Sequence, residues 1–157
     1  MNDLTHFDES GRARMVDVSA KDVTTRIAVA SGEIHMSANT LEHIQQGKLK
    51  KGDVLAVADV AAIMGAKKTP DLIPMCHPLM LSGIEVSFSE LEQTCGINVE
   101  VSVKCNGKTG VEMEALTAVG TALLTIYDMC KAVDKGMTLS NICLDEKRGG
   151  KSGDYKR

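Results

Sequence analysis

The sequence predicts an α+β fold, a single domain in which helices cover one face of an antiparallel sheet. Residues 83–91 and 96–105 each alternate apolar and polar side chains, and the short stretch 94–96 between them predicts a hairpin. The third observation is the segment from about 111 to 133, where apolar residues recur at spacings of three and four. That spacing is typical of a long helix that buries one side.

The elements before the hairpin follow from local signals. Residues 25–36 contain strand-forming side chains in loose alternation and predict the first strand. Capping side chains at 37–40 predict a short helix over 41–46, which Gly47 ends. Residues 54–68, rich in alanine, predict a second helix with one small apolar face.

Residues 67–80 contain all three prolines of the chain, spaced four residues apart at Pro70, Pro74 and Pro78. Proline at this spacing disfavours a helix, and it pushes each preceding residue toward extended geometry. The sequence therefore predicts a stiff, irregular ribbon. One interpretation is a rigid connector, and the other is a support for the functional side chains of Lys67, Lys68, Cys76 and His77.

After the long helix, Gly136 is a stop signal and residues 137–146 predict the last strand. The order strand, helices, strand, strand, long helix, strand is the β-α-β-β-α-β arrangement of a ferredoxin-like sandwich. We expect one domain over 1–157, with the polar segments 1–14 and 148–157 mobile. The long helix is rich in Ala, Gly and Thr, which suits close packing against another subunit.

The composition of the chain disfavours several classes of function. The net charge is −3, Trp is absent and only two Phe and two Tyr are present, so a nucleic-acid surface with stacking platforms is disfavoured and an anionic partner is expected to be small. Five cysteines without a C-x-x-C pair argue against a disulfide framework or a structural zinc site and favour a reducing cytoplasm. No apolar run is long enough to span a membrane.

The long helix carries two groups of candidate acid–base residues. Asp128 and Lys131 stand at i, i+3, which indicates either a surface ion pair or, because Asp128 is the single charge between 115 and 129, a part-buried pair tuned for proton transfer. Glu112 and Glu114 stand at the other end. Asp128 lies roughly 20 Å from Glu114 along the helix, so one small-molecule site would need helices from two subunits to use both.

His77 is the candidate hydrogen-bond donor or proton carrier of the proline-containing segment. A metal site is disfavoured because His6, His35 and His43 stand in ordinary surface contexts, and adjacent residues of an extended chain project apart, so Cys76 is expected to pack. The stretches 106–110 (NGKTG) and 149–153 (GGKSG) lack the upstream glycine of a P-loop. Each remains a glycine-rich turn beside a lysine that suits phosphate.

Five blocks of the sequence resemble the MoaC family of molybdenum-cofactor biosynthesis: 15–21, 51–80, 107–119, 124–137 and 149–155. The resemblance implies a ferredoxin-like hexamer, a trimer of dimers with active sites at a dimer interface. It implies conversion of 3′,8-cyclo-7,8-dihydroguanosine 5′-triphosphate, which a radical-SAM enzyme makes from GTP, into cyclic pyranopterin monophosphate and pyrophosphate. No protein-bound metal or other cofactor is implied, although magnesium would be compatible with the triphosphate.

Site residues follow from the same resemblance. It implies that Asp128 and Lys131 are the catalytic pair, a hypothesis in which Asp128 is the base and Lys131 the acid. The implied substrate pocket consists of Met75, Cys76, His77, Glu112, Met113 and Glu114. Its further polar and triphosphate contacts are Lys51, Lys67, Lys21, Arg26 and Lys147. Two other functions remain open alternatives: an oligomeric scaffold without enzymatic activity, and a hydrolase that binds GTP or a pterin.

Overall fold

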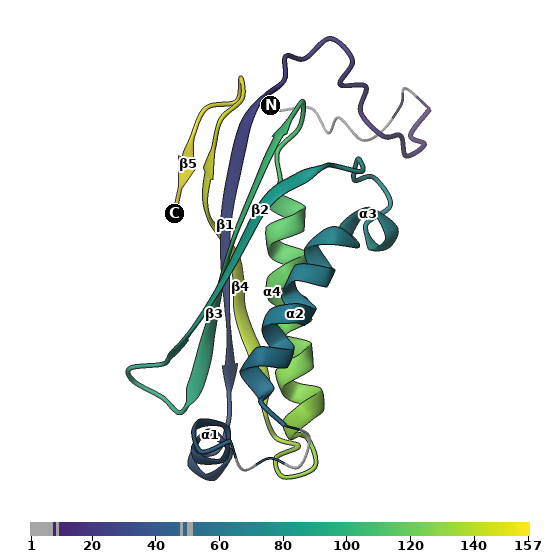
Figure 1. The fold of residues 1–157 in the computed structure, drawn as a ribbon. Coiled ribbons are helices and arrows are strands. Elements are labelled where there is room, and N and C mark those ends of the chain that lie inside the picture. The colour runs from purple at the N-terminus through teal and green to yellow at the C-terminus, as the bar shows by residue number, and fades with distance from the viewer. Residues whose placement is uncertain (1–7, 9, 48, 50–51) are drawn as a thin grey trace.

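A five-stranded antiparallel sheet in the order β2-β3-β1-β4-β5 forms one layer of the protein (Figure 1). It is seen in a computed structural model that describes residue 8, residues 10–47, residue 49 and residues 52–157. The strands are β1 (Thr24–His35), β2 (Leu81–Glu90), β3 (Gly96–Gly107), β4 (Thr138–Arg148) and β5 (Tyr155–Lys156). The first four strands have the order and connectivity of a ferredoxin-like sheet, as the sequence predicts.

Helices form the second layer. They are α1 (Ala38–Gln45), α2 (Val54–Lys67), α3 (Thr69–Leu72) and α4 (Glu112–Cys130). The two long helices, α2 and α4, lie side by side on one face of the sheet (Figure 1). Alternate side chains of β1 and β3 turn toward them and are fully buried, among them Ala28, Ile34 and Val101. The hydrophobic core therefore lies between the sheet and this helix pair.

Glycine allows the close packing of the helix layer. A Cβ atom added to Gly65 of α2 would lie 2.8 Å from the Cβ of Thr121 on α4, closer than real Cβ contacts. Gly32 of β1 has the same role toward the other side of α4, because an added Cβ would lie 2.7 Å from Cγ1 of Val119. The close approaches at Gly65 and Gly32 set the position of α4 against α2 and β1, and with it the position of the site described below.

The hairpin prediction is confirmed, with Val86 opposite Val101 in the β2–β3 register. The exclusion of helix from the whole proline-containing segment is wrong at residues 69–72, which form α3. Pro70 occupies the first turn of this helix, where the missing N–H has no partner to lose. Residues 73–80 lie outside helices and strands, as predicted.

The ends of several elements differ from the prediction. Helix α1 begins at Ala38, three residues early, because the side chain of Ser37 accepts a hydrogen bond from the Thr40 amide and caps the helix. Strand β4 extends to Arg148, and Tyr155–Lys156 add β5, which pairs with β4. Among the described residues, no helix has the length and apolarity needed to cross a membrane.

Candidate active site

A cavity of about 260 Å³ lies where three segments distant in the sequence meet. Met75, Cys76 and His77 follow α3, and Glu112, Met113 and Glu114 form the first turn of α4. The third side is the N-terminal segment 16–21, which contributes Val16, Val18 and Lys21. Figure 1 shows this segment crossing the end of the molecule that carries α3 and the start of α4. The cavity brings together the six residues of the predicted substrate pocket.

Local chain geometry places these side chains. The Cys76 amide donates to the Ile73 carbonyl at 3.1 Å, so a turn follows α3 and presents residues 75–77 to the cavity. Glu112 and Glu114 stand in the first turn of α4, where the helix dipole favours negative charge. The end of the proline-containing segment therefore forms one wall of the cavity.

Glu114 is the buried carboxyl group of this cavity, with 3% of the residue exposed. Burial raises its pKa, and the neighbouring charge of Glu112 raises the pKa further. Burial also raises the pKa of the Cys76 thiol, with Glu114 and Glu112 contributing. Cys76 is therefore held as a neutral thiol, which agrees with its interpretation as a packing residue rather than a nucleophile.

A second, cationic cavity of about 170 Å³ adjoins the first and shares Lys21, Thr109, Gly110 and Glu112 with it. Its other charged lining residues are Arg26, Lys108, Lys147 and Arg148. Both glycine-rich turns noted in the sequence supply its backbone. Nζ of Lys147 lies 2.9 Å from Oε1 of Glu112, and both side chains are about a quarter exposed. An anion that is larger than the first cavity would extend into this one.

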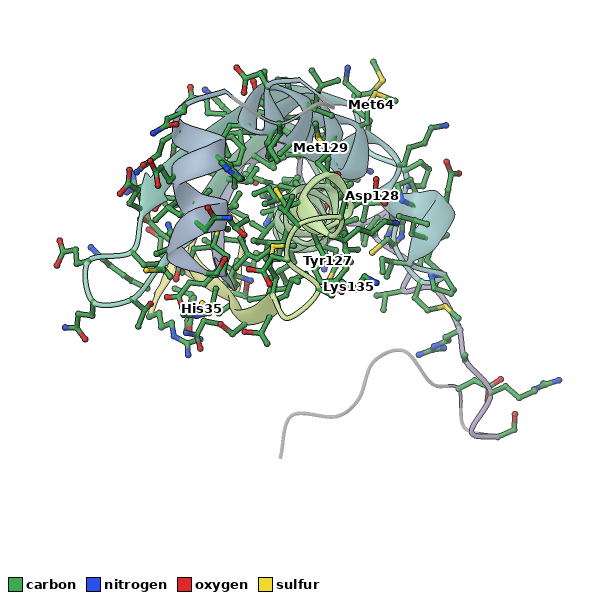
Figure 2. All side chains as sticks on the ribbon, turned by 90° about the horizontal axis from the view of Figure 1, so that it is seen from below. His35, Met64, Tyr127, Asp128, Met129 and Lys135 are labelled. Atoms are coloured by element: carbon green, nitrogen blue, oxygen red, sulfur yellow. The ribbon has the colours of Figure 1, made fainter. Side chains whose placement is uncertain are left out.

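Asp128 and Lys131 form the ion pair that their spacing predicts, with 2.6 Å between Oδ1 and Nζ. The predicted partial burial of Asp128 is wrong for the single chain, since 58% of its side chain and 53% of that of Lys131 are exposed. The reason is that Asp128 lies on the side of α4 that is turned away from the hydrophobic core. Figure 2, a view from this end, shows Asp128 and Met129 on different sides of the helix.

The two ends of the predicted site remain apart in one chain. Asp128 lies at the end of α4 and Glu114 at its start, and neither Asp128 nor Lys131 is among the described residues that line the two cavities. Lys67 is exposed in the last turn of α2 and also lies outside them. Lys51 lies outside the described residues. The single chain thus brings together the first cavity and the cationic cavity, but not the predicted catalytic pair with them.

Sequence reasoning missed several lining residues. Val16 and Val18 were not singled out, although their alternation in the block 15–21 marks side chains that turn inward together. Lys108 belongs to the noted NGKTG turn, and its Nζ donates to the Ser19 carbonyl at 2.7 Å. This bond ties the N-terminal segment to the turn.

The prediction that His35 stands in an ordinary surface context is wrong, because its ring makes contacts with three elements. Its Nε2 lies 3.0 Å from Oε2 of Glu33 and 2.9 Å from Oγ of Ser140, and its Nδ1 lies 3.2 Å from Oγ1 of Thr94. These contacts join β1, β4 and the hairpin turn, away from the cavities. Among the described residues, no three His, Cys, Asp or Glu side chains gather in a way that would hold a metal ion.

Comparison with known proteins shows to which family the chain belongs. Residues 15–150 match the MoaC family. The chain belongs to the MoaC family. This confirms the resemblance seen in the sequence. The matched range contains every lining residue of the first cavity and every lining residue of the cationic cavity except Ser152.

Individual relatives extend the match over nearly the full length. A cyclic pyranopterin monophosphate synthase of Desulfitobacterium hafniense is 62% identical over 155 residues, 99% of this chain and 94% of the relative. The protein of the same name from Thermoanaerobacter sp. is 60% identical over 154 residues, 98% of each chain. That of Heliobacterium modesticaldum is 59% identical over 157 residues, 100% of this chain and 99% of the relative.

Proposed function

We propose that this MoaC-family chain is a cyclic pyranopterin monophosphate synthase, a lyase of molybdenum-cofactor biosynthesis. It converts 3′,8-cyclo-7,8-dihydroguanosine 5′-triphosphate into cyclic pyranopterin monophosphate and releases pyrophosphate. One observation carries the proposal beyond the family match: a cavity with a buried carboxyl group adjoins a second cavity lined by cations. A ligand with a heterocycle at one end and a polyphosphate at the other matches this arrangement.

The heterocycle belongs in the first cavity. Opening and re-closing the ring system requires several proton transfers, which are best served by groups whose pKa lies near the working pH. Glu114 has its pKa raised toward that range by burial, and His77 shares the cavity. We assign these two residues to hold and exchange protons with the changing ring, and Met75, Cys76 and Met113 to shape the cavity around it.

The triphosphate belongs in the cationic cavity. Cyclisation forms a bond from a sugar hydroxyl to the α-phosphorus and breaks the bond to pyrophosphate, which leaves with increased negative charge. Lys21 and Lys147 line this cavity and would stabilise that charge. Lys147 is held by Glu112 at 2.9 Å before the anion arrives. Lys51 and Lys67 complete the set of proposed phosphate and polar contacts.

The catalytic pair would come from a second copy of the chain. The outward face of α4 carries residues at spacings of three and four, namely Met113, Thr117, Gly120, Leu124, Asp128 and Lys131. Leu124 is 61% exposed, and an added Cβ at Gly120 would meet no atom within 4 Å. This face is therefore apolar and small at its centre, as helices that pack closely require.

An antiparallel pairing of two α4 helices about a twofold axis beside Gly120 makes the site complete. It places Asp128 of one chain opposite Met113 of the other, because the two positions are about equally distant from the axis. Since Met113 lines the first cavity, Asp128 and Lys131 would reach the cavity of the partner. We extend this to a hexamer built as a trimer of such dimers, acting in the cytoplasm on the product of a radical-SAM GTP cyclase, without nucleic acid or membrane partners.

Product analysis tests the synthase assignment. The purified protein is incubated with the cyclised GTP intermediate, and pyrophosphate and the pterin are quantified. We expect both products in equal amounts and none from unmodified GTP. Formation of inorganic phosphate from GTP would instead indicate a hydrolase, and absence of any product from the intermediate would leave only the scaffold interpretation.

A further inference from the structure

Arg26 differs from the other cations of the site in what its guanidinium contacts. The residue is only 9% exposed. Its Nε donates to the carbonyl of Gly107 at 3.3 Å, its Nη1 to that of Gly149 at 3.3 Å, and its Nη2 to that of Lys108 at 3.4 Å. All three acceptors are backbone groups, and they belong to the two glycine-rich turns, which lie about 40 residues apart in the chain.

The second turn is shaped around this guanidinium. Gly149 and Gly150 adopt left-handed backbone angles, with φ of +88° and +91°. A Cβ atom at Gly150 would overlap Nη1 of Arg26, and one at Gly149 would overlap the carbonyl oxygen of Thr25. Both residues must therefore be glycine for the turn to close against β1.

We propose that Arg26 is a positioning residue that clamps the two glycine-rich turns together and so builds the cationic cavity that it lines. This inference depends on the proposed phosphate end of the site. The clamp fixes the backbone beside two lysines that line the cationic cavity, Lys108 and Lys147. Positive charges that would repel one another are thereby held around one anion-sized space.

Lys108 extends the effect to the first cavity. Arg26 donates a hydrogen bond to the carbonyl of Lys108, and Nζ of Lys108 donates to the Ser19 carbonyl at 2.7 Å. Ser19 lies between Val18 and Lys21, which line the heterocycle cavity. The position of the N-terminal wall therefore depends on the same clamp.

Three variants test the clamp. Arg26→Lys keeps the charge but replaces a fork of three donors by a single ammonium group, and Arg26→Gln removes the charge. Gly150→Ala keeps Arg26 and displaces its guanidinium. The matched control is Gly47→Ala, which also adds a methyl group at a left-handed glycine, with φ +62°, but with no atom within 4 Å of that group. A second control, Arg12→Lys, changes an exposed arginine of the N-terminal segment.

Two measurements on the ligand-free, full-length protein are informative: hydrogen exchange of the amides in 107–110 and 148–153, and the Kd for inorganic triphosphate. We expect all three variants to exchange about tenfold faster at both turns and to bind triphosphate about tenfold more weakly, since each loses hydrogen bonds from a charged donor. Arg26→Lys should resemble Arg26→Gln, because both lose the forked guanidinium and the charge that Lys keeps does not restore its three hydrogen bonds. Both controls should behave as the unmodified protein.

A different pattern would overturn the proposal. If Arg26→Lys kept the native Kd and exchange while Arg26→Gln lost affinity, Arg26 would act through its charge on the anion. If Gly150→Ala left both measurements unchanged, the guanidinium would not seat the turn. Neither measurement requires turnover, so an error in the synthase assignment would appear in the product analysis and would leave this result readable. In steady state the clamp predicts a raised KM with a smaller change in kcat.

Discussion

Two carboxylates on α4 show how differently one helix treats the same chemical group. Glu114 is 3% exposed and faces the cavity, whereas the side chain of Asp128 is 58% exposed and faces outward. The pKa of Glu114 is raised by burial. The pKa of Lys131 is raised by its hydrogen bond to Asp128, so that ammonium group stays charged at neutral pH.

Replacing Glu114 by Gln should stabilise the fold at neutral pH. The folded-state pKa of Glu114 lies above its ordinary value of 4.5, so between these two values the folded protein binds more protons than the unfolded chain. The free energy of unfolding therefore falls as pH rises through this window, and the charged carboxylate costs stability above it. Urea unfolding should show Glu114→Gln as the more stable protein at pH 7.5, with an advantage that shrinks toward pH 4.5.

The opposite pH trend for that advantage would contradict the burial of Glu114 as the cause. Glu112→Gln is a suitable comparison, because Glu112 is partly exposed and paired with Lys147. That variant should lose its ion pair rather than relieve a buried charge.

Removing either member of the Asp128–Lys131 pair should abolish most activity without unfolding the protein. We expect Asp128→Asn and Lys131→Ala each to lower kcat about 10²- to 10⁴-fold, the usual range for a positioned acid or base. The midpoint of urea unfolding should stay near that of the parent protein, since both side chains are more than half exposed. Near-normal turnover in both variants would show that the assignment of acid and base is wrong.

At the scale of elements, the contact between α2 and α4 determines where the site residues stand. Helix α4 supplies residues to both ends of the proposed site, and its position against α2 depends on Gly65. The neighbouring Thr121 donates its hydroxyl to the Thr117 carbonyl at 2.7 Å, so its side chain is held in place and leaves no room for an added atom.

Gly65→Ala should therefore separate the two helices. The added methyl group would lie 2.8 Å from the Cβ of Thr121 and 3.2 Å from the Thr117 carbonyl oxygen. Overpacking of this kind costs about 2 kcal/mol, which urea unfolding would measure as a lower midpoint. Gly83→Ala in β2 is the control, because its Cβ would make an ordinary contact at 3.8 Å and should change stability by less than about 0.5 kcal/mol.

At the scale of the whole molecule, the proposed site is divided between the two ends of one long helix. The pocket and the cationic cavity lie at the start of α4, and the ion pair lies at its end. The proposed shared site in a dimer would cover Leu124, which the single chain exposes on the outward face of α4.

Subunit complementation tests the shared site. His77→Ala alters the pocket, Asp128→Asn alters the distant end, and each variant alone should be inactive. Co-expressed in equal amounts and purified together, they should recover about a quarter of the parent activity, because half of the dimers are mixed and each mixed dimer has one intact site. No recovery would show that Asp128 serves the cavity of its own chain or none, provided that native mass spectrometry shows mixed oligomers.

Much of this protein follows from local patterns. The alternation in 83–91 and 96–105 sets the hairpin, because a strand buries every second residue, and the spacing in 111–133 sets the long helix. The five blocks that resemble the MoaC family also predict the six pocket residues that the structure brings together in the first cavity. Pro70 was misjudged because its effect depends on position: at the first turn of a helix it is tolerated.

Tertiary structure alone decided the environment of each group. Nothing in the order of residues shows that Glu114 is buried and Asp128 exposed, since both stand on one helix whose neighbours lie far away in the sequence. The same holds for Arg26, whose guanidinium joins two turns that lie more than 80 residues further along the chain. Local periodicity determines which elements form, whereas burial, charge environment and the meeting of distant turns arise only when those elements pack together.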